Sequence, residues 1–200
     1  ISECLVGSEM CIRDSRRPYT RYQQAVHKYP NLLNRSFDQA KPNQFWVTDI
    51  TYIPISGNML YMCAVLDLCG KVVLAWKIGA DMTSSLVTDT IREALQTEKV
   101  TGGLALHSDQ GSQYTSQAYF DLAQAYHVSP SMSSPGCPYD NAAMENFFGT
   151  LKTECLYRAH FTTRAEVEQL VTEYVDFYNF ERIAPVSYTH LRAHETLANL

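Results

Sequence analysis

The chain has no long apolar run, which excludes the usual kind of membrane-spanning helix. No stretch approaches the roughly 18 consecutive apolar residues of a span, although 46% of the 200 residues are hydrophobic. The opening stretch, ISECLVGSEMC, lacks the basic start of a signal peptide and carries two glutamates. These absences predict a cytoplasmic protein without a membrane partner. The length is sufficient for one domain with a sizeable core.

The chain also lacks a positive net charge and a cysteine framework. Its net charge of −5 argues against a stand-alone DNA-binding module, which is normally basic. A nucleic-acid enzyme is not excluded, because a carboxylate site takes its positive charge from a metal. The six cysteines include no C-x-x-C pair and no His/Cys set at zinc spacing. We therefore expect free thiols, with Cys63 and Cys155 packed as small hydrophobic residues.

Both ends of the chain look foreign to the fold. Residues 1–15 and 184–200 resemble translated sequencing-adaptor sequence, and we expect them to lie outside the folded unit. Residues 16–42 are predicted to be a basic connector that prolines interrupt. Residues 43–183 are predicted to form the folded core.

Within the core, three strand patterns precede an alternation of helices and strands. The runs QFWVTDITYI, MLYMCAVLDL and KVVLAWKIG are rich in β-forming residues and are separated by turn signals, so they predict an antiparallel meander. Helical spacing follows at 84–96, 116–126, 141–156 and 163–180, with Asp140 as the candidate N-cap of the third helix. Short strands are predicted at 104–109 and 128–132. The order implies an α/β domain with a mixed sheet.

Three carboxylates stand where this arrangement could bring them together. Asp49 lies inside the first strand, Asp109 directly follows an apolar strand, and Glu145 lies beside the apolar stripe of a helix. Lys152 is seven residues beyond Glu145 and shares its helix face. Taken singly, each acid fits a surface or turn residue equally well. Converging carboxylates need a cation to stay ionised, so together they indicate a Mg²⁺ or Mn²⁺ site that acts on phosphate.

The segments QFWVTDITYI, HSDQGSQYTS and SMSSPGCPYDNAAMENFFGTLKTE resemble the catalytic core of bacterial insertion-sequence transposases of the DDE class, relatives of retroviral integrases. The last two acids are separated by the 35 residues typical of that family. The resemblance covers about residues 16–183. It implies a ribonuclease-H-like fold whose five-stranded mixed sheet has the order 3-2-1-4-5 and is flanked by helices.

The resemblance also implies roles for individual residues. Asp49 would bridge two Mg²⁺ or Mn²⁺ ions, and Asp109 and Glu145 would each hold one. The remaining candidates would contact DNA or support the acids: Lys152 near the scissile phosphate, Asn141 and Tyr139 along the DNA groove, and His107 behind Asp109. The implied activity is DNA end cleavage and strand transfer by a homo-oligomer on element ends and target DNA, in a bacterial cytoplasm.

Three alternatives remain open from the sequence. One is a ribonuclease-H-like nuclease on the same fold, and the second is a truncated, inactive transposase fragment that binds DNA weakly. The third is an α/β domain whose acids are ordinary surface residues. The helix-turn-helix that normally precedes such a core, and the run that normally follows residues 178–183, have no match in the sequence. The inverted-repeat sequence, the target sequence and the host cannot be inferred.

Overall fold

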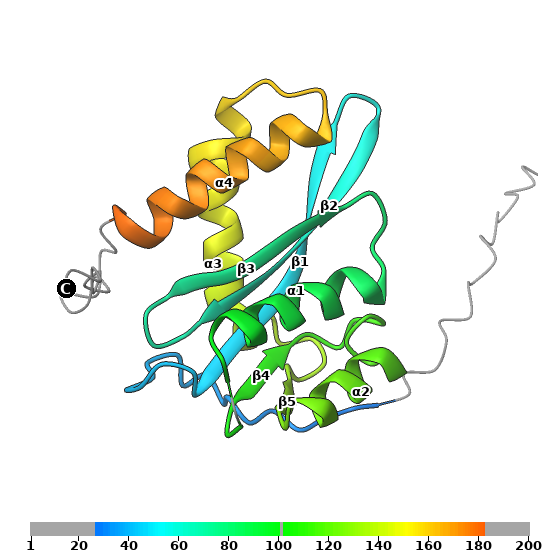
Figure 1. The fold of residues 1–200 in the computed structure, drawn as a ribbon, viewed down its shortest axis with the longest axis vertical. Coiled ribbons are helices and arrows are strands. Elements are labelled where there is room, and N and C mark those ends of the chain that lie inside the picture. Colours follow the sequence, from blue (N-terminus) through cyan, green and yellow to red (C-terminus); the bar gives the residue numbers. More distant parts are fainter. Residues whose placement is uncertain (1–26, 101, 183–200) are drawn as a thin grey trace, which may run out of the picture.

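A five-stranded mixed sheet forms the centre of the protein in the computed structural model, which describes residues 27–100 and 102–182 (Figure 1). Its strand order is β3-β2-β1-β4-β5, as expected for a ribonuclease-H-like fold. The first three strands pair antiparallel, and β4 and β5 join parallel to β1 and to each other. The strands are β1 (Phe45–Ile55), β2 (Asn58–Asp67), β3 (Val72–Gly79), β4 (Ala105–Ser108) and β5 (Ser129–Met132).

Helices cover both faces of this sheet (Figure 1). The main helices are α1 (Ser84–Thr97), α2 (Gln117–Ala125), α3 (Ala142–Thr150) and α4 (Arg164–Phe180). One core layer packs α3 and α4 against the sheet, and the second packs α1 and α2 against the other face. No helix among the described residues is long and apolar enough to cross a membrane.

The two core layers follow from the alternation of side chains along β1. Val47 and Ile53 belong to the layer under α3 and α4, whereas Trp46 belongs to the layer under α1 and α2. Successive side chains of a strand point to opposite faces. Asp49 therefore shares the face of Val47 and Ile53, and Thr48 lies on the opposite face. The alternation of side chains along β1 therefore decides which helices face Asp49 and which face Thr48.

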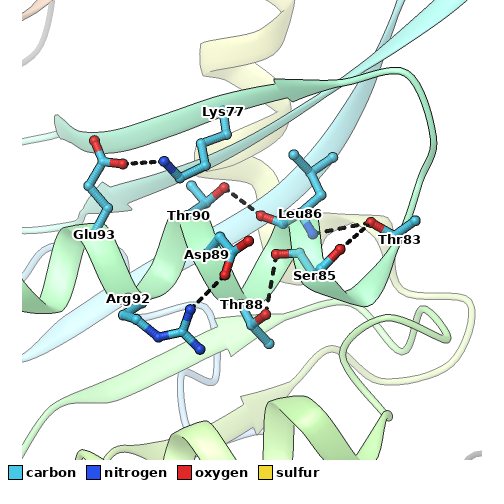
Figure 2. A network of polar contacts seen from close by, with 9 residues as sticks. All are labelled: Lys77, Thr83, Ser85, Leu86, Thr88, Asp89, Thr90, Arg92 and Glu93. Atoms are coloured by element: carbon cyan, nitrogen blue, oxygen red, sulfur yellow. Dashed lines mark hydrogen bonds and ion pairs between the residues drawn. The ribbon is translucent and has the colours of Figure 1, made fainter.

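Local signals fix where the helices begin. Thr83 caps α1 by accepting a hydrogen bond from the Leu86 amide, and Lys77 of β3 forms an ion pair with Glu93 of the same helix (Figure 2). Thr163 and Glu166 form a capping box at the start of α4. The Thr83 cap and the capping box satisfy amide groups that a helix start leaves without partners, whereas the Lys77–Glu93 ion pair joins α1 to β3.

The predicted continuous helix over 141–156 is wrong in detail. Helix α3 ends at Thr150, and the chain continues as a π-helical turn η2 (Leu151–Cys155) and a 3₁₀ turn η3 (Leu156–Arg158). Asp140 is not the N-cap, because it lies inside the 3₁₀ turn η1 (Pro138–Asn141) and Asn141 occupies the cap position. The spacing of the apolar residues fits both a continuous α-helix and the observed turns, because the π-helical turn keeps Leu151 buried.

The division of the chain into foreign ends, connector and core stays a prediction. The proposed foreign ends, 1–15 and 184–200, and the connector up to residue 26 lie outside the described residues. From His27 to Pro42 the connector forms turns and bends without a helix or strand. The cysteines of the described ranges are free thiols, and Cys63 is fully buried.

Candidate functional site

Asp49 lies in the middle of β1, on the side that faces α3. Its neighbour across the sheet is Ala64 of β2, a small residue that leaves room beside the carboxylate. The side chain is half-buried, and its Oδ1 accepts a hydrogen bond from the Ile50 amide at 2.7 Å. A half-buried carboxylate has lost part of its contact with water, so part of its charge needs other compensation.

Asp109 follows β4 and lies alongside Asp49. Parallel pairing sets Val47 opposite His107, and the same register continued by two residues brings Asp109 next to Asp49. Asp109 is exposed, and its Oδ1 accepts a hydrogen bond from the Gly111 amide at 2.9 Å. A Cβ atom on Gly111 would lie 2.9 Å from that oxygen. The glycine therefore permits the close approach of this carboxylate to the loop.

Glu145 comes from the first turn of α3. Met144, Phe147 and Phe148 are buried against the sheet and fix the rotation of the helix, which leaves Glu145 exposed at the edge of the buried side. A negative charge in the first turn is favoured by the partial positive charge of a helix N-terminus. The three carboxylates are thus supplied by β1, by the loop after β4 and by α3.

Asp49, Asp109, Glu145 and Lys152 lie near enough to one another for their charges to interact. Burial raises the pKa of Asp49 to about 7, and the hydrogen bond from the Ile50 amide opposes this rise. The negative charges of Asp109 and Glu145 contribute smaller upward shifts to this same pKa, and the positive charge of Lys152 contributes a downward one. Three residues that were separate candidates in the sequence therefore act on the carboxyl group of a fourth, Asp49.

The three carboxylates have the charge and the oxygen atoms that a divalent cation prefers. In the present arrangement they are not close enough together to hold one. In the described ranges, no group of three His, Cys, Asp or Glu side chains is close enough to hold a metal ion as it stands. Asp49 and Asp109 each direct an oxygen to a nearby backbone amide instead. Binding a cation would require these carboxylates to turn from the amides toward one another. The pKa of Asp49 is raised mainly by burial and to a smaller extent by the charges of Asp109 and Glu145, and a bound cation would offset both effects.

Lys152 stands at the start of the π-helical turn and is half-buried. The sequence argument placed it on the face of Glu145 through regular α-helical spacing. The structure reaches the same neighbourhood although the helix changes form at Leu151, as the effect of Lys152 on the Asp49 pKa shows. Such π turns often occur at functional sites.

The two residues predicted to line a DNA groove have different environments. Tyr139 is 69% exposed, with the guanidinium carbon of Arg35 5.9 Å from its ring centre. Asn141 is only 5% exposed, and its Nδ2 donates a hydrogen bond to the Thr48 carbonyl oxygen at 3.5 Å. The surface position expected for Asn141 is therefore not found: its side chain connects the start of α3 to the strand that carries Asp49.

His107 is buried two residues before Asp109 and joins β4 to β5. Its Nδ1 lies 2.8 Å from the Ser131 hydroxyl, and its Nε2 lies 3.0 Å from the Ser133 hydroxyl. Burial lowers the pKa of His107 to about 4, so the ring is neutral at pH 7. The ring holds the strand that delivers Asp109, and we continue to regard it as a supporting residue.

Sequence reasoning missed several residues that hold the site together. Tyr114 is buried, and its hydroxyl lies 3.1 Å from the hydroxyl of Thr48. Asp140 accepts hydrogen bonds from Asn31 and Arg35, about a hundred residues earlier in the chain. For Tyr114, the available signal was a tyrosine in an otherwise polar loop. No local pattern could have revealed the partners of Asp140.

Comparison with protein families agrees with the fold. Two models, each described as an integrase core domain, match residues 39–138 and 145–195. The first match contains Asp49 and Asp109, and the second begins at Glu145.

Curated relatives are insertion-sequence transposases. The chain is 39% identical over 174 residues to the transposase for insertion sequence element IS904 of Lactococcus lactis, which covers 86% of this chain and 69% of the relative. It is 35% identical over 163 residues to the transposase InsF for insertion sequence IS3A of Escherichia coli, covering 80% and 57%. The chain thus spans between about half and about two thirds of the length of such relatives.

Solved structures share the fold at low identity. An intasome of simian T-cell lymphotropic virus in complex with the PP2A regulatory subunit B56 gamma contains a chain that matches with a TM-score of 0.64 at 19% identity, over 77% of this chain and 53% of that one. The HTLV-2 integrase catalytic core in complex with magnesium matches with a TM-score of 0.55 at 17% identity, over 72% and 90%. The Mos1 transposase catalytic domain with raltegravir and manganese matches with a TM-score of 0.57 at 14% identity, over 67% and 70%. By the matches of its sequence, the chain belongs to the IS3 family of insertion-sequence transposases, which have a retroviral-integrase-like core.

Proposed function

We propose that the chain is the catalytic core of a transposase that cuts DNA at the ends of a mobile element and joins the exposed 3′ ends to other DNA. The observation that carries this proposal is that β1, the loop after β4 and the first turn of α3 supply Asp49, Asp109 and Glu145, close enough for their charges to interact. Its relatives are named as transposases of insertion sequences, which supports DNA as the substrate.

The reaction that we propose requires two Mg²⁺ or Mn²⁺ ions, held by Asp49, Asp109 and Glu145. Bound divalent ions lower the pKa of an attacking water or 3′-hydroxyl and stabilise the leaving oxygen. Carboxylate oxygens favour hard cations of this type. The magnesium in the HTLV-2 integrase core and the manganese in the Mos1 transposase support the same choice here.

The residues of the chain would prepare the site in distinct ways. Asp49, with its pKa near 7, would release its proton when a cation binds. Asp109 would turn its carboxylate away from the Gly111 amide. Lys152 would contact a DNA phosphate next to the scissile bond, and the exposed ring of Tyr139 would contact DNA at the rim.

Both chemical steps are then in-line displacements at phosphorus. In the first, a water oxygen bonds to phosphorus, the bond to the 3′-oxygen breaks, and the 3′-oxygen takes up a proton. In the second, that 3′-hydroxyl attacks a phosphate of another DNA, and a new 3′-hydroxyl leaves. No covalent bond to the protein forms, so no serine or tyrosine nucleophile is needed. We further propose that copies of the chain assemble on DNA, in a bacterial cytoplasm.

Nicking of supercoiled plasmid DNA tests this proposal without knowledge of the element ends. The 200-residue protein should nick the plasmid in Mn²⁺ and not in EDTA. Glu145→Gln removes a ligand charge at nearly constant shape and should abolish nicking. Glu173→Gln is the matched control, because Glu173 is an exposed residue of α4 on a different helix.

A second substrate, a short duplex with a free 3′-hydroxyl, tests strand transfer into the same plasmid. Joined products that depend on Mn²⁺ and on Glu145 would support the full reaction. Wild-type protein that neither nicks nor joins DNA in Mg²⁺ or in Mn²⁺ would contradict the proposal. Equal activity in wild type and Glu145→Gln would contradict the assignment of the site.

A further inference from the structure

Asp140 is a buried carboxylate in the loop that leads from β5 into α3, and it is 3% exposed. Its Oδ1 accepts a hydrogen bond from Arg35 Nε at 2.8 Å. Its Oδ2 accepts hydrogen bonds from Asn31 Nδ2 and from the Ser134 amide, both at 3.0 Å. Hydrogen bonds to a charged group are about twice as strong as neutral ones. This single side chain therefore ties the loop to itself and to the segment before β1.

The other end of the same loop is also fixed. The Ser133 amide donates a hydrogen bond to the Ser108 carbonyl oxygen at 2.9 Å, and the Ser133 hydroxyl contacts the ring of His107. The loop from Ser133 to Asn141 is thus attached at its start to β4, the strand that leads to Asp109. At its end it is attached through Asp140 to the connector.

The backbone of the connector turns so that the side chains of Asn31 and Arg35 reach Asp140. Asn34 and Arg35 both have positive φ angles, 45° and 61°, which are uncommon outside glycine. The Asn34 amide donates to Asn31 Oδ1 at 3.0 Å, and Leu33 is buried in the core. The Leu32 amide donates to the Ser131 hydroxyl at 2.8 Å. The backbone is held in this turn from several sides.

We propose that Asn31, Arg35 and Asp140 form a positioning clamp that sets Glu145 against Asp49 and Asp109. The inference rests on the proposed function. Asp140 precedes Glu145 by little more than one helical turn, so fixing Asp140 fixes the start of α3. Asn141 continues the connection through its hydrogen bond to the Thr48 carbonyl oxygen. The connector is therefore part of the active-site architecture, and a change in it would reach Glu145.

Substitution of Arg35 tests the clamp in the 200-residue chain, because this side chain is half exposed and its loss should not prevent folding. Arg35→Ala should weaken Mn²⁺ binding, measured by calorimetry, by about tenfold or more, as for other partners that orient metal ligands. It should also speed hydrogen exchange of the amides from Ser134 to Asn146. Arg35→Lys keeps the charge and should restore part of the affinity. Exchange in β1, β2 and β3 should stay unchanged.

Arg92→Ala is the control, because Arg92 is similarly exposed but its ion-pair partner on α1, Asp89, is an exposed carboxylate far along the chain from the loop. It should change neither Mn²⁺ affinity nor exchange in the loop. Unchanged exchange in Arg35→Ala would overturn the clamp. Faster exchange with unchanged Mn²⁺ affinity would overturn its role in positioning. Failure of the proposed function has another signature, since wild-type protein would then neither bind Mn²⁺ nor nick DNA.

Discussion

The hydroxyl groups of Thr48 and Tyr114 lie 3.1 Å apart in the buried interior, where they join β1 to the loop after β4. Thr48 immediately precedes Asp49, and Tyr114 lies in the loop that begins with Asp109. One contact therefore links the two segments that supply these acids. It does so from the face of β1 opposite Asp49, so it can orient the strand and the loop without entering the site.

Removing the Tyr114 hydroxyl should disturb the site through this link. Tyr114→Phe should lower the free energy of unfolding by about 1 kcal/mol, the usual net value of one hydrogen bond. It should also weaken Mn²⁺ binding. Urea unfolding and calorimetry measure the two effects. Tyr157→Phe, at a tyrosine that is 70% exposed, should change neither. A Tyr114→Phe protein with wild-type stability and affinity would show that the contact has no such role.

Gly111 offers a change that should affect function more than stability. In Gly111→Ala the new Cβ would meet the Asp109 carboxylate and displace it, at little cost to folding because that side chain can move. We expect weaker Mn²⁺ binding and slower DNA nicking with nearly unchanged unfolding. Gly149→Ala is the control: no atom lies within 4 Å of its added Cβ, and alanine in a helix should stabilise the protein by about 0.5–1 kcal/mol. If both variants bind Mn²⁺ as wild type does, the Asp109–Gly111 contact is unimportant.

Asp49 should make the metal-free protein less stable as the pH rises. Its pKa in the folded protein is about 7, mainly because of burial, whereas its ordinary value is 3.8. Between these values the unfolded chain has lost the proton and the folded protein keeps it. The contribution of this group is therefore fully present below about pH 4 and is lost as the pH rises through 7.

Asp49→Asn removes that titration. In EDTA at pH 8 the variant should be more stable than wild type by about 2 kcal/mol, about half of what 1.4 kcal/mol per pKa unit would give, since water still reaches the site. At pH 4 the difference should vanish. Denaturant unfolding across this range measures it. A constant difference, or none at pH 8, would contradict the raised pKa of Asp49.

Lys152 should separate DNA binding from metal binding. Lys152→Ala should weaken binding of a labelled duplex and lower the salt dependence by about one counterion, as expected for the loss of one phosphate contact. Mn²⁺ binding should not weaken, because a nearby ammonium group opposes a cation. Fluorescence anisotropy at several salt concentrations measures the first effect. Lys99→Ala, at an exposed lysine after α1, is the control. Equal salt dependence of DNA binding in the two variants would show that Lys152 does not contact a DNA phosphate.

The elements that carry the three acids could be predicted from the sequence because each has a local signature. β-forming residues mark the strand of Asp49, an apolar run ends at Asp109, and an apolar stripe orients the helix of Glu145. The family resemblance gave the strand order, which the sheet confirms. Residue patterns alone implied only a mixed sheet, since they do not state which strands are neighbours.

The contacts that support the site could not be predicted, since they join residues far apart in the chain. Asp140 was predicted to be a helix cap from its place just before an apolar helical pattern. Its actual partners, Asn31 and Arg35, are too distant in the sequence for a local pattern to reveal them. Asn141 looked like a surface loop residue, and its burial depends on the Thr48 carbonyl oxygen of a strand almost a hundred residues earlier. The π turn at Leu151 was hidden because its buried residues keep a spacing that an α-helix also allows.

Calorimetric titration of the 200-residue protein with Mn²⁺, with wild type beside Asp109→Asn, is the decisive test of whether the three carboxylates form a metal site. The account predicts binding by wild type that weakens as the pH falls below 7, because Asp49 must release its proton, and that is lost in Asp109→Asn. Folded wild-type protein that fails to bind millimolar Mn²⁺, with DNA present as well as without it, would contradict the account. Equal binding by the two proteins would contradict it too.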